Sequence, residues 1–166
     1  MLRHVVAYLR ARQVTVTSAE SCTAGLIAAL LADVEGAGEV LECGFVAYTP
    51  EAKMRCLGVH AATIDTHGLT SEAVAAEMAG GALRHSPAVL AIANTGVADG
   101  SQPAVPAGTQ CFAWALRADS GGAVAVTSQT LRLSGDRHEV RIAAARHALS
   151  ALPLMHERLL GMLASS

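Results

Sequence analysis

Aromatic residues are scarce in this sequence, at 3% of its 166 residues, and charged residues make up only 16%. Proteins bind single-stranded nucleic acids by stacking bases on aromatic side chains, and duplexes require a basic surface that a net charge of −2 does not supply. Nucleic-acid binding is therefore not expected. Because 52% of the residues are hydrophobic, disorder is excluded, and the length suits one domain, residues 1–166, with a core of Ala, Val and Leu.

The sequence also lacks the long apolar run that a transmembrane helix requires, because its longest clean run, Leu26–Ala32, is too short. The N-terminal stretch MLRHVVAYLRARQ is interrupted by arginines and a histidine, so it has no signal-peptide core. Its four cysteines show no C-x-x-C pairing, and its seven histidines show no metal-ligand spacing. We therefore expect a cytoplasmic protein with reduced thiols, no metal site and no membrane association.

The hydrophobic pattern switches repeatedly between a helical period and strand-like segments. Helices are predicted at Leu2–Ala11, Thr23–Leu31, Pro50–Leu57, Thr70–Arg84 and Asp136–Leu163, the last broken near Pro153. Strands are predicted at Val14–Thr17, Val40–Tyr48, Ala88–Thr95, Thr109–Arg117 and Ala123–Leu133. The apolar run of the third strand is typical of a central strand buried on both faces, and the last two strands form a hairpin. This order indicates an α/β sheet with helices on both faces, and the hairpin makes the sheet mixed.

Sites in sheets of this kind lie at the carboxyl ends of strands, which selects Ser18–Gly25, Tyr48–Lys53 and Asn94–Gly108. In the first segment, Ser21 stands where a helix N-terminus offers unpaired amides that can hold an oxyanion while the hydroxyl attacks a carbonyl. Ser21 is thus the candidate nucleophile, and the alternative is that it only caps the helix. Cys22 is a second candidate nucleophile, because its helix-terminal position is expected to lower its pKa.

A serine nucleophile needs a base, and Lys53 in the second segment is the candidate. A lysine accepts a proton only when it is neutral, which requires burial or nearby positive charge to lower its pKa. Lys53 is the sole lysine of the chain, although an ordinary surface lysine is the alternative. Tyr48 either positions a proton there or stands as an exposed aromatic at the rim. Glu20 either holds the nucleophile loop by hydrogen bonds or pairs with an arginine.

Two later segments carry features typical of ligand binding. NTGVADG, from Asn94, leaves a buried strand with glycines that allow unusual backbone angles, and it either lines a pocket or is an ordinary surface connection. In LSGDRHEVR, Arg137 and Arg141 lie about one helical turn apart near a helix N-terminus. These arginines either seat a phosphate, or they face solvent while Asp136 caps the helix.

Taken together, the motifs resemble one family, the CinA C-terminal domain or nicotinamide-nucleotide amidohydrolase family. The resemblance covers the chain from about Leu2 to the C-terminal helix, and the motifs recur in order with matching spacing. They are AESCTAG at Ala19, GFVAYTPEAK from Gly44, LGV at Leu57, HGLTSEAVAAEMAGGAL from His67, TGVADG at Thr95, PAGT at Pro106 and SGDRHEVR at Ser134. Longer relatives carry an additional N-terminal domain similar to molybdopterin-binding proteins, so this sequence is interpreted as the stand-alone form.

The resemblance implies a three-layer α/β/α fold and hydrolysis of nicotinamide mononucleotide to nicotinic acid mononucleotide and ammonia, a step of pyridine nucleotide salvage. It implies no metal or organic cofactor, with Ser21 as nucleophile, Lys53 as its base and Tyr48 beside them. The partner would be a small-molecule nucleotide, and the aliphatic composition suggests a homo-oligomer. The expected substrate-binding residues are Glu20, Cys22, Thr23, Ala24, Gly25, Thr95, Gly96, Gly135, Arg137 and Arg141.

Two positions depart from the family pattern. Ala24 replaces a glycine, which an alanine tolerates only where φ is not positive. Asp99 replaces a glycine where close backbone approach to the ligand is expected, and its carboxylate would repel a phosphate. These departures motivate the alternative function, a family member that binds a nucleotide or a partner protein without hydrolysing nicotinamide mononucleotide.

Overall fold

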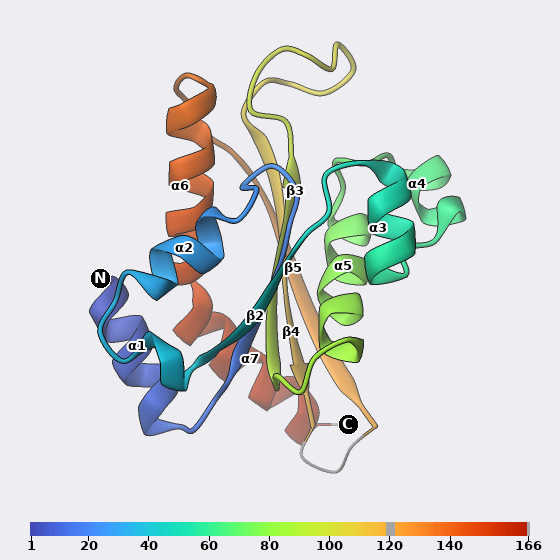
Figure 1. Cartoon of the computed structure of the whole chain (residues 1–166). Coiled ribbons are helices and arrows are strands. Elements are labelled where there is room, and N and C mark those ends of the chain that lie inside the picture. Colours follow the sequence, from blue (N-terminus) through green and yellow to red (C-terminus); the bar gives the residue numbers. More distant parts are fainter. Residues whose placement is uncertain (119–121, 166) are drawn as a thin grey trace.

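A five-stranded mixed sheet with helices on both faces forms the computed structural model, which describes residues 1–118 and 122–165 (Figure 1). The strands are β1 (Val16–Glu20), β2 (Leu41–Val46), β3 (Leu90–Gly96), β4 (Thr109–Arg117) and β5 (Val124–Arg132). Their order is β2-β1-β3-β4-β5, in which β1 is parallel to β2 and β3, and β4 is antiparallel to β3 and β5. The carboxyl ends of β1, β2 and β3 therefore lie at one edge of the sheet.

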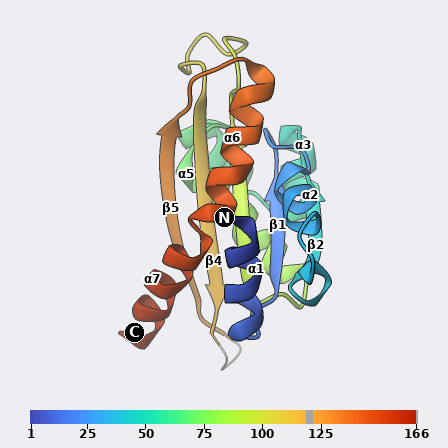
Figure 2. The same ribbon diagram turned by 90° about the vertical axis from the view of Figure 1, so that its left-hand side faces the viewer.

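The helices divide between the two faces of the sheet, which gives three layers (Figures 1 and 2). One face carries α1 (Leu2–Ala11), α2 (Leu26–Ala32), α6 (Arg137–Ser150) and α7 (Leu152–Ala164). The other carries α3 (Pro50–Leu57), α4 (Ala61–His67) and α5 (Glu72–Arg84). A short 3₁₀ helix, Ala37–Glu39, precedes β2. The predicted α/β/α architecture with a mixed sheet is confirmed.

The two faces of the sheet bury different kinds of side chain. Along β3 and β4, Ile92, Phe112 and Trp114 pack toward α1, α2, α6 and α7, while the alternate positions Ala93 and Ala113 pack toward α5. This two-residue period is the ordinary consequence of the pleat of a strand. On the α5 side, the buried side chains of the sheet are mainly alanines, which leave little space between the helix and the sheet. This side of the core is therefore filled without aromatic residues that are fully buried.

Several element boundaries differ from the predictions for identifiable reasons. The helix expected from Thr23 begins only at Leu26, because Ala24 and Gly25 have φ values of +49° and +95°, which no α-helix accommodates. The first strand was predicted at Val14–Thr17, and the observed strand β1 lies at Val16–Glu20. The closing helix is interrupted at Ala151, which separates α6 from α7, and Pro153 lies in the first turn of α7, where its missing N–H costs nothing.

The helices α1 and α3 and the strand β4 have the predicted boundaries, whereas α4 was not predicted. α4 buries none of its residues, so it carries no apolar stripe that a periodicity could reveal. In the described part of the chain, none of the helices has both the length and the apolar character needed to cross a bilayer.

Candidate active site

Three strand ends and one helix N-terminus surround a cavity of about 320 Å³. Ser21 follows β1, Lys53 lies in the first turn of α3 after β2, Thr95 and Gly96 end β3, and Arg137 begins α6. Of the residues predicted to form the site, seven line the cavity: Ser21, Cys22, Tyr48, Lys53, Thr95, Gly96 and Arg137. The others, Glu20, Thr23, Ala24, Gly25, Gly135 and Arg141, lie outside the lining. Leu69 and Thr70, which precede α5, line it too and were not predicted.

The amine of Lys53 meets the hydroxyl of Ser21, with 2.8 Å between Nζ and Oγ. Nζ also donates to the carbonyl oxygens of Ala47 at 3.1 Å and Tyr48 at 2.9 Å. A neutral amine has two N–H groups and one lone pair, so these carbonyls accept both N–H groups and leave the lone pair facing Ser21. The geometry therefore suits the neutral amine as a proton acceptor from the hydroxyl.

Burial makes that neutral form accessible. The side chain of Lys53 is 2% exposed, and desolvation lowers its pKa from 10.5 to about 8. Within the described residues, no carboxylate lies within ion-pair distance of Nζ, so nothing counteracts this effect. The position follows from local sequence, because the Thr49 hydroxyl caps α3 by accepting the Ala52 N–H at 3.1 Å and Pro50 begins the helix.

Glu20 organises the nucleophile loop, residues 21–25, which connects β1 to α2. Its carboxylate is fully buried and accepts the N–H groups of Gly25, Ile27 and Ala28 at 2.8 to 3.0 Å, and also the Ser18 hydroxyl at 2.9 Å. The acid therefore satisfies the N-terminal amides of α2, a favourable place for negative charge. It forms the hydrogen bonds that sequence reasoning offered as one of two possibilities, and it makes no ion pair with an arginine among the described residues.

The amides that could hold an oxyanion are fewer than the sequence suggested. The Thr23 N–H is donated to Asn94 Oδ1 at 3.2 Å, and the Ala24 N–H to the Ser21 carbonyl at 3.0 Å. With the Gly25 N–H on Glu20, only the Cys22 amide in this loop has no acceptor among the described residues. It directly follows the serine, where an amide can face a carbonyl oxygen under attack by Oγ.

Ala24 adopts the left-handed conformation at φ +49°, where a Cβ is strained. We expect Ala24→Gly to raise the free energy of unfolding by about 0.5–1 kcal/mol, because glycine relieves this strain and loses some of the gain to backbone entropy. Urea denaturation measures the change. The matched control is Ala29→Gly, at another exposed alanine but inside α2, which is expected to lower stability by about 1 kcal/mol. If Ala24→Gly were destabilising too, the strain argument would be wrong.

A buried pair of amides that sequence reasoning missed supports this loop. Asn94 Nδ2 donates to Gln110 Oε1 at 3.0 Å, and Gln110 Nε2 donates to the Val97 carbonyl at 3.1 Å and to Cys22 Sγ at 3.4 Å. Both amide side chains are fully buried. The signal in the sequence was Gln110 itself, which directly precedes the apolar stretch CFAWAL in a predicted strand. A polar side chain buried in such a strand must find hydrogen-bond partners.

The thiol of Cys22 is not activated as expected from its position. It is 5% exposed, and burial raises its pKa, with the Gln110 hydrogen bond acting in the opposite direction as a smaller effect. A thiol with a raised pKa is a poorer source of thiolate at neutral pH. The structure therefore favours Ser21 over Cys22 as the nucleophile.

Arg137 and Arg141 do not form the joint phosphate seat that one interpretation expected. Arg141 donates to the carbonyl oxygens of Cys22 at 2.9 Å and Thr23 at 3.2 Å, so it ties the nucleophile loop to α6. Arg137 instead reaches the cavity mouth, where Nη2 lies 2.8 Å from the Tyr48 hydroxyl. Asp136 is the N-cap of α6 and forms a capping box with Glu139.

Tyr48 and Gly96 contribute to the cavity through their backbones: the Tyr48 carbonyl binds the Lys53 amine, and the Gly96 backbone lies close to the neighbouring strand. The Tyr48 ring is exposed at the mouth, and its carbonyl, not its hydroxyl, contacts the Lys53 amine. At Gly96, a Cβ would lie 2.5 Å from the carbonyl oxygen of Thr109 on the paired strand β4, so only glycine fits there. Gly135, with φ +128°, belongs to the turn that enters α6.

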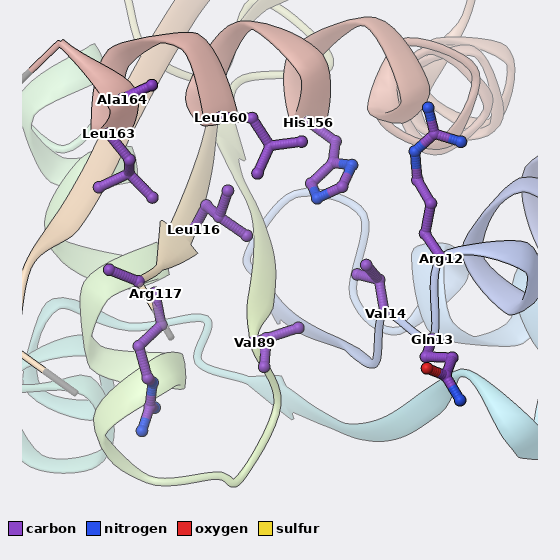
Figure 3. A pocket seen from close by; sticks show the side chains of 11 residues that line it. Arg12, Gln13, Val14, Val89, Leu116, Arg117, His156, Leu160, Leu163 and Ala164 are labelled. Atoms are coloured by element: carbon purple, nitrogen blue, oxygen red, sulfur yellow. The ribbon is translucent and has the colours of Figure 1, made fainter. Parts of the chain in front are cut away.

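A second hollow, of about 480 Å³, lies at the opposite edge of the sheet beneath α7 (Figure 3). Its walls are mostly aliphatic, and Figure 3 shows the Arg117 guanidinium directed away from it. The buried His156 at its edge is hydrogen-bonded through Nδ1 to the Tyr8 hydroxyl at 2.8 Å. Its lining residues do not pair a nucleophile with a base as the strand-end cavity does.

Comparison with known proteins identifies the same family as the motifs that meet at the Ser21 cavity. The CinA C-terminal domain, as a family model, matches residues 1–155. The chain belongs to this family. The nicotinamide-nucleotide amidohydrolase PncC of Escherichia coli K12 is 42% identical over 146 residues, which cover 87% of this chain and 86% of that protein. A CinA-like protein of Chlorobaculum tepidum is 43% identical over 150 residues, covering 89% of this chain.

CinA family members differ in length. The chain spans about a third of the C. tepidum protein and of several other curated CinA-like relatives, with 33–37% of each relative covered. Among solved structures, the competence/damage inducible protein CihA from Agrobacterium tumefaciens superposes with a TM-score of 0.84 at 36% identity, covering 93% of both chains. A CinA superfamily protein from Klebsiella pneumoniae also gives 0.84, at 37% identity with 96% of both chains covered. The three-layer fold is thus that of the family.

Proposed function

We propose that this chain is an amidohydrolase that converts nicotinamide mononucleotide to nicotinic acid mononucleotide and ammonia, with Ser21 as nucleophile and Lys53 as base. The observation that carries the proposal is the 2.8 Å contact between Ser21 Oγ and a buried lysine amine whose remaining N–H groups are already occupied. The name and coverage of the E. coli relative support the substrate.

The first half of the reaction forms an ester on Ser21. Oγ attacks the carboxamide carbon while its proton passes to the Lys53 amine. The carbonyl oxygen becomes an oxyanion, and the Cys22 N–H is the amide available to stabilise it. The Lys53 ammonium then donates its proton to the departing nitrogen, the C–N bond breaks, and ammonia leaves.

The second half returns the enzyme to its starting state. Water attacks the ester carbon, and Lys53 accepts a proton from that water. The C–O bond to Ser21 breaks as Lys53 gives the proton back to Oγ, and the carboxylic acid leaves. The sum of both halves is amide plus water giving acid plus ammonia, which the dyad completes without an external oxidant or reductant.

The remaining residues of the loop hold this geometry. The Glu20 carboxylate, the Thr23 N–H and the Arg141 guanidinium fix the backbone around Ser21 through hydrogen bonds, and Asn94 and Gln110 support it from the sheet. They are positioning residues, because their side chains lie outside the cavity lining. The nucleotide would place its carboxamide at Ser21 and its sugar and phosphate toward the mouth.

The experiment that tests the proposal is incubation of the purified chain with nicotinamide mononucleotide, followed by chromatography and an ammonia assay. We expect nicotinic acid mononucleotide and ammonia in equal amounts. Free nicotinamide without ammonia would mean cleavage of the glycosidic bond and would contradict the proposal. Binding by calorimetry without any turnover would favour the alternative function, a nucleotide-binding family member without hydrolytic activity.

A further inference from the structure

The Arg137 guanidinium joins three segments at the mouth of the Ser21 cavity. From the N-terminus of α6 it donates through Nη1 to Asp99 Oδ2 at 2.7 Å, in the loop after β3, and through Nη2 to the Tyr48 hydroxyl at 2.8 Å, after β2. Apart from Lys53, it is the one cationic side chain lining the cavity within the described residues. An anionic end of a substrate therefore has one fixed cation to reach, and that cation already holds a carboxylate.

We propose that Asp99 determines substrate specificity by occupying the anion position on Arg137, so that it weakens selection for a phosphorylated substrate over the corresponding nucleoside. This inference rests on the proposed function, because it concerns the distal end of the same pyridine substrate. Asp99 acts at the mouth and does not take part in the amide chemistry.

The position of the carboxylate is set by two contacts. Oδ1 accepts the Ser101 N–H at 3.0 Å, and Oδ2 accepts from Arg137. The hydrogen bonds from Ser101 and Arg137 lower the pKa of Asp99 from 3.8 to about 2. The group is therefore ionised throughout the neutral range, and the Arg137–Asp99 pair has little net charge.

A phosphate and a hydroxyl meet this pair differently. A phosphate that reaches Nη1 competes with Oδ2 for the same donor and is repelled by a carboxylate a few ångströms away. A nucleoside hydroxyl carries no charge, and it can donate to the carboxylate while accepting from the Tyr48 hydroxyl. The exposed pair is weak enough for a phosphate to displace, so Asp99 lowers the preference for phosphate without preventing its binding.

The test compares kcat/KM for nicotinamide mononucleotide and nicotinamide riboside in the wild type, Asp99→Asn and Asp33→Asn. Asparagine keeps the shape and the Oδ1 acceptor but removes the charge. We expect the nucleotide-to-nucleoside ratio of kcat/KM to rise about tenfold in Asp99→Asn. Asp33 is an exposed aspartate at the end of α2, so its substitution makes the same change in net charge away from the cavity and should leave the ratio unaltered.

Inorganic phosphate supplies a second readout that does not depend on which substrate is turned over. Titration by calorimetry should show about tenfold tighter phosphate binding to Asp99→Asn than to the wild type. An unchanged ratio together with unchanged phosphate affinity would overturn the inference. If neither pyridine substrate is hydrolysed, the proposed function fails, while tighter phosphate binding by Asp99→Asn would still support the assignment of Asp99. A melting curve for each variant establishes that it is folded.

Discussion

Ser21→Ala is expected to stop the release of ammonia from nicotinamide mononucleotide, lowering kcat by about a thousandfold or more. The substitution removes the atom that attacks the carboxamide, and the Lys53 amine has no other hydroxyl within hydrogen-bond distance in the described residues. Stability should change little, by about 1 kcal/mol or less, because only one hydrogen bond is lost and the amine keeps its two carbonyl acceptors. A coupled ammonia assay and a thermal melt measure the two effects.

The neighbouring Cys22→Ala variant distinguishes the two candidate nucleophiles. If the thiol were the attacking group, this substitution would remove activity and Ser21→Ala would not. Turnover that persists in Ser21→Ala would eliminate the serine mechanism, whatever Cys22→Ala does. A mass increase corresponding to the acyl group, trapped by rapid acid quench in the wild type and missing in Ser21→Ala, would identify the ester directly.

Lys53→Met is expected to lose activity and to gain stability. Removing the general base should lower kcat by a factor of about 10²–10⁴. Methionine has a similar length and carries no charge, so the fold no longer buries an amine without a counter-ion. We expect a gain of about 1–2 kcal/mol at pH 7, a case in which a functional group costs stability. Thermal melts and the ammonia assay on the same preparation check both signs.

The pH dependence of the wild type follows from the same lysine. The pKa of Lys53 is about 8 in the folded chain and 10.5 when unperturbed, so below pH 8 both states carry the proton and the full cost of burying the charge is present. Between pH 8 and 10.5 the unfolded state binds more protons, so this group's contribution to stability rises with pH. The kcat/KM value should rise to a plateau above pH 8, because the free enzyme needs the neutral amine.

Arg55→Met is the matched control for both effects. Arg55 is an exposed cation on the same helix, so its removal should neither raise the stability nor change the pH profile of kcat/KM. A Lys53→Met variant that kept its activity, or that melted at a lower temperature than the wild type at pH 7, would contradict the assignment of Lys53 as a base whose pKa is lowered by burial.

Much of the site could be predicted because parallel strands place their carboxyl ends together. The segments around Ser21 and Lys53, and the loop after the apolar strand, were selected on that rule, and the structure brings them to one cavity. Within those segments, Ser21 was selected as a hydroxyl at a helix N-terminus and Lys53 as the sole lysine of the chain, and the family motifs then matched both residues. The direction taken by each arginine was not predictable, because Arg137 and Arg141 share one helix, and which side chain faces the cavity depends on how α6 packs.

The sequence by itself determined the alternation of strands and helices, the apolar central strand and the family, because periodicity, capping residues and motif order are local properties of the chain. Only the tertiary structure decided that the sole lysine is buried beside the serine without a counter-ion. It also decided that the Glu20 carboxylate accepts the loop amides and that Asp99 pairs with Arg137. Burial, pKa and charge pairing arise between segments distant in the chain, and no local pattern encodes them.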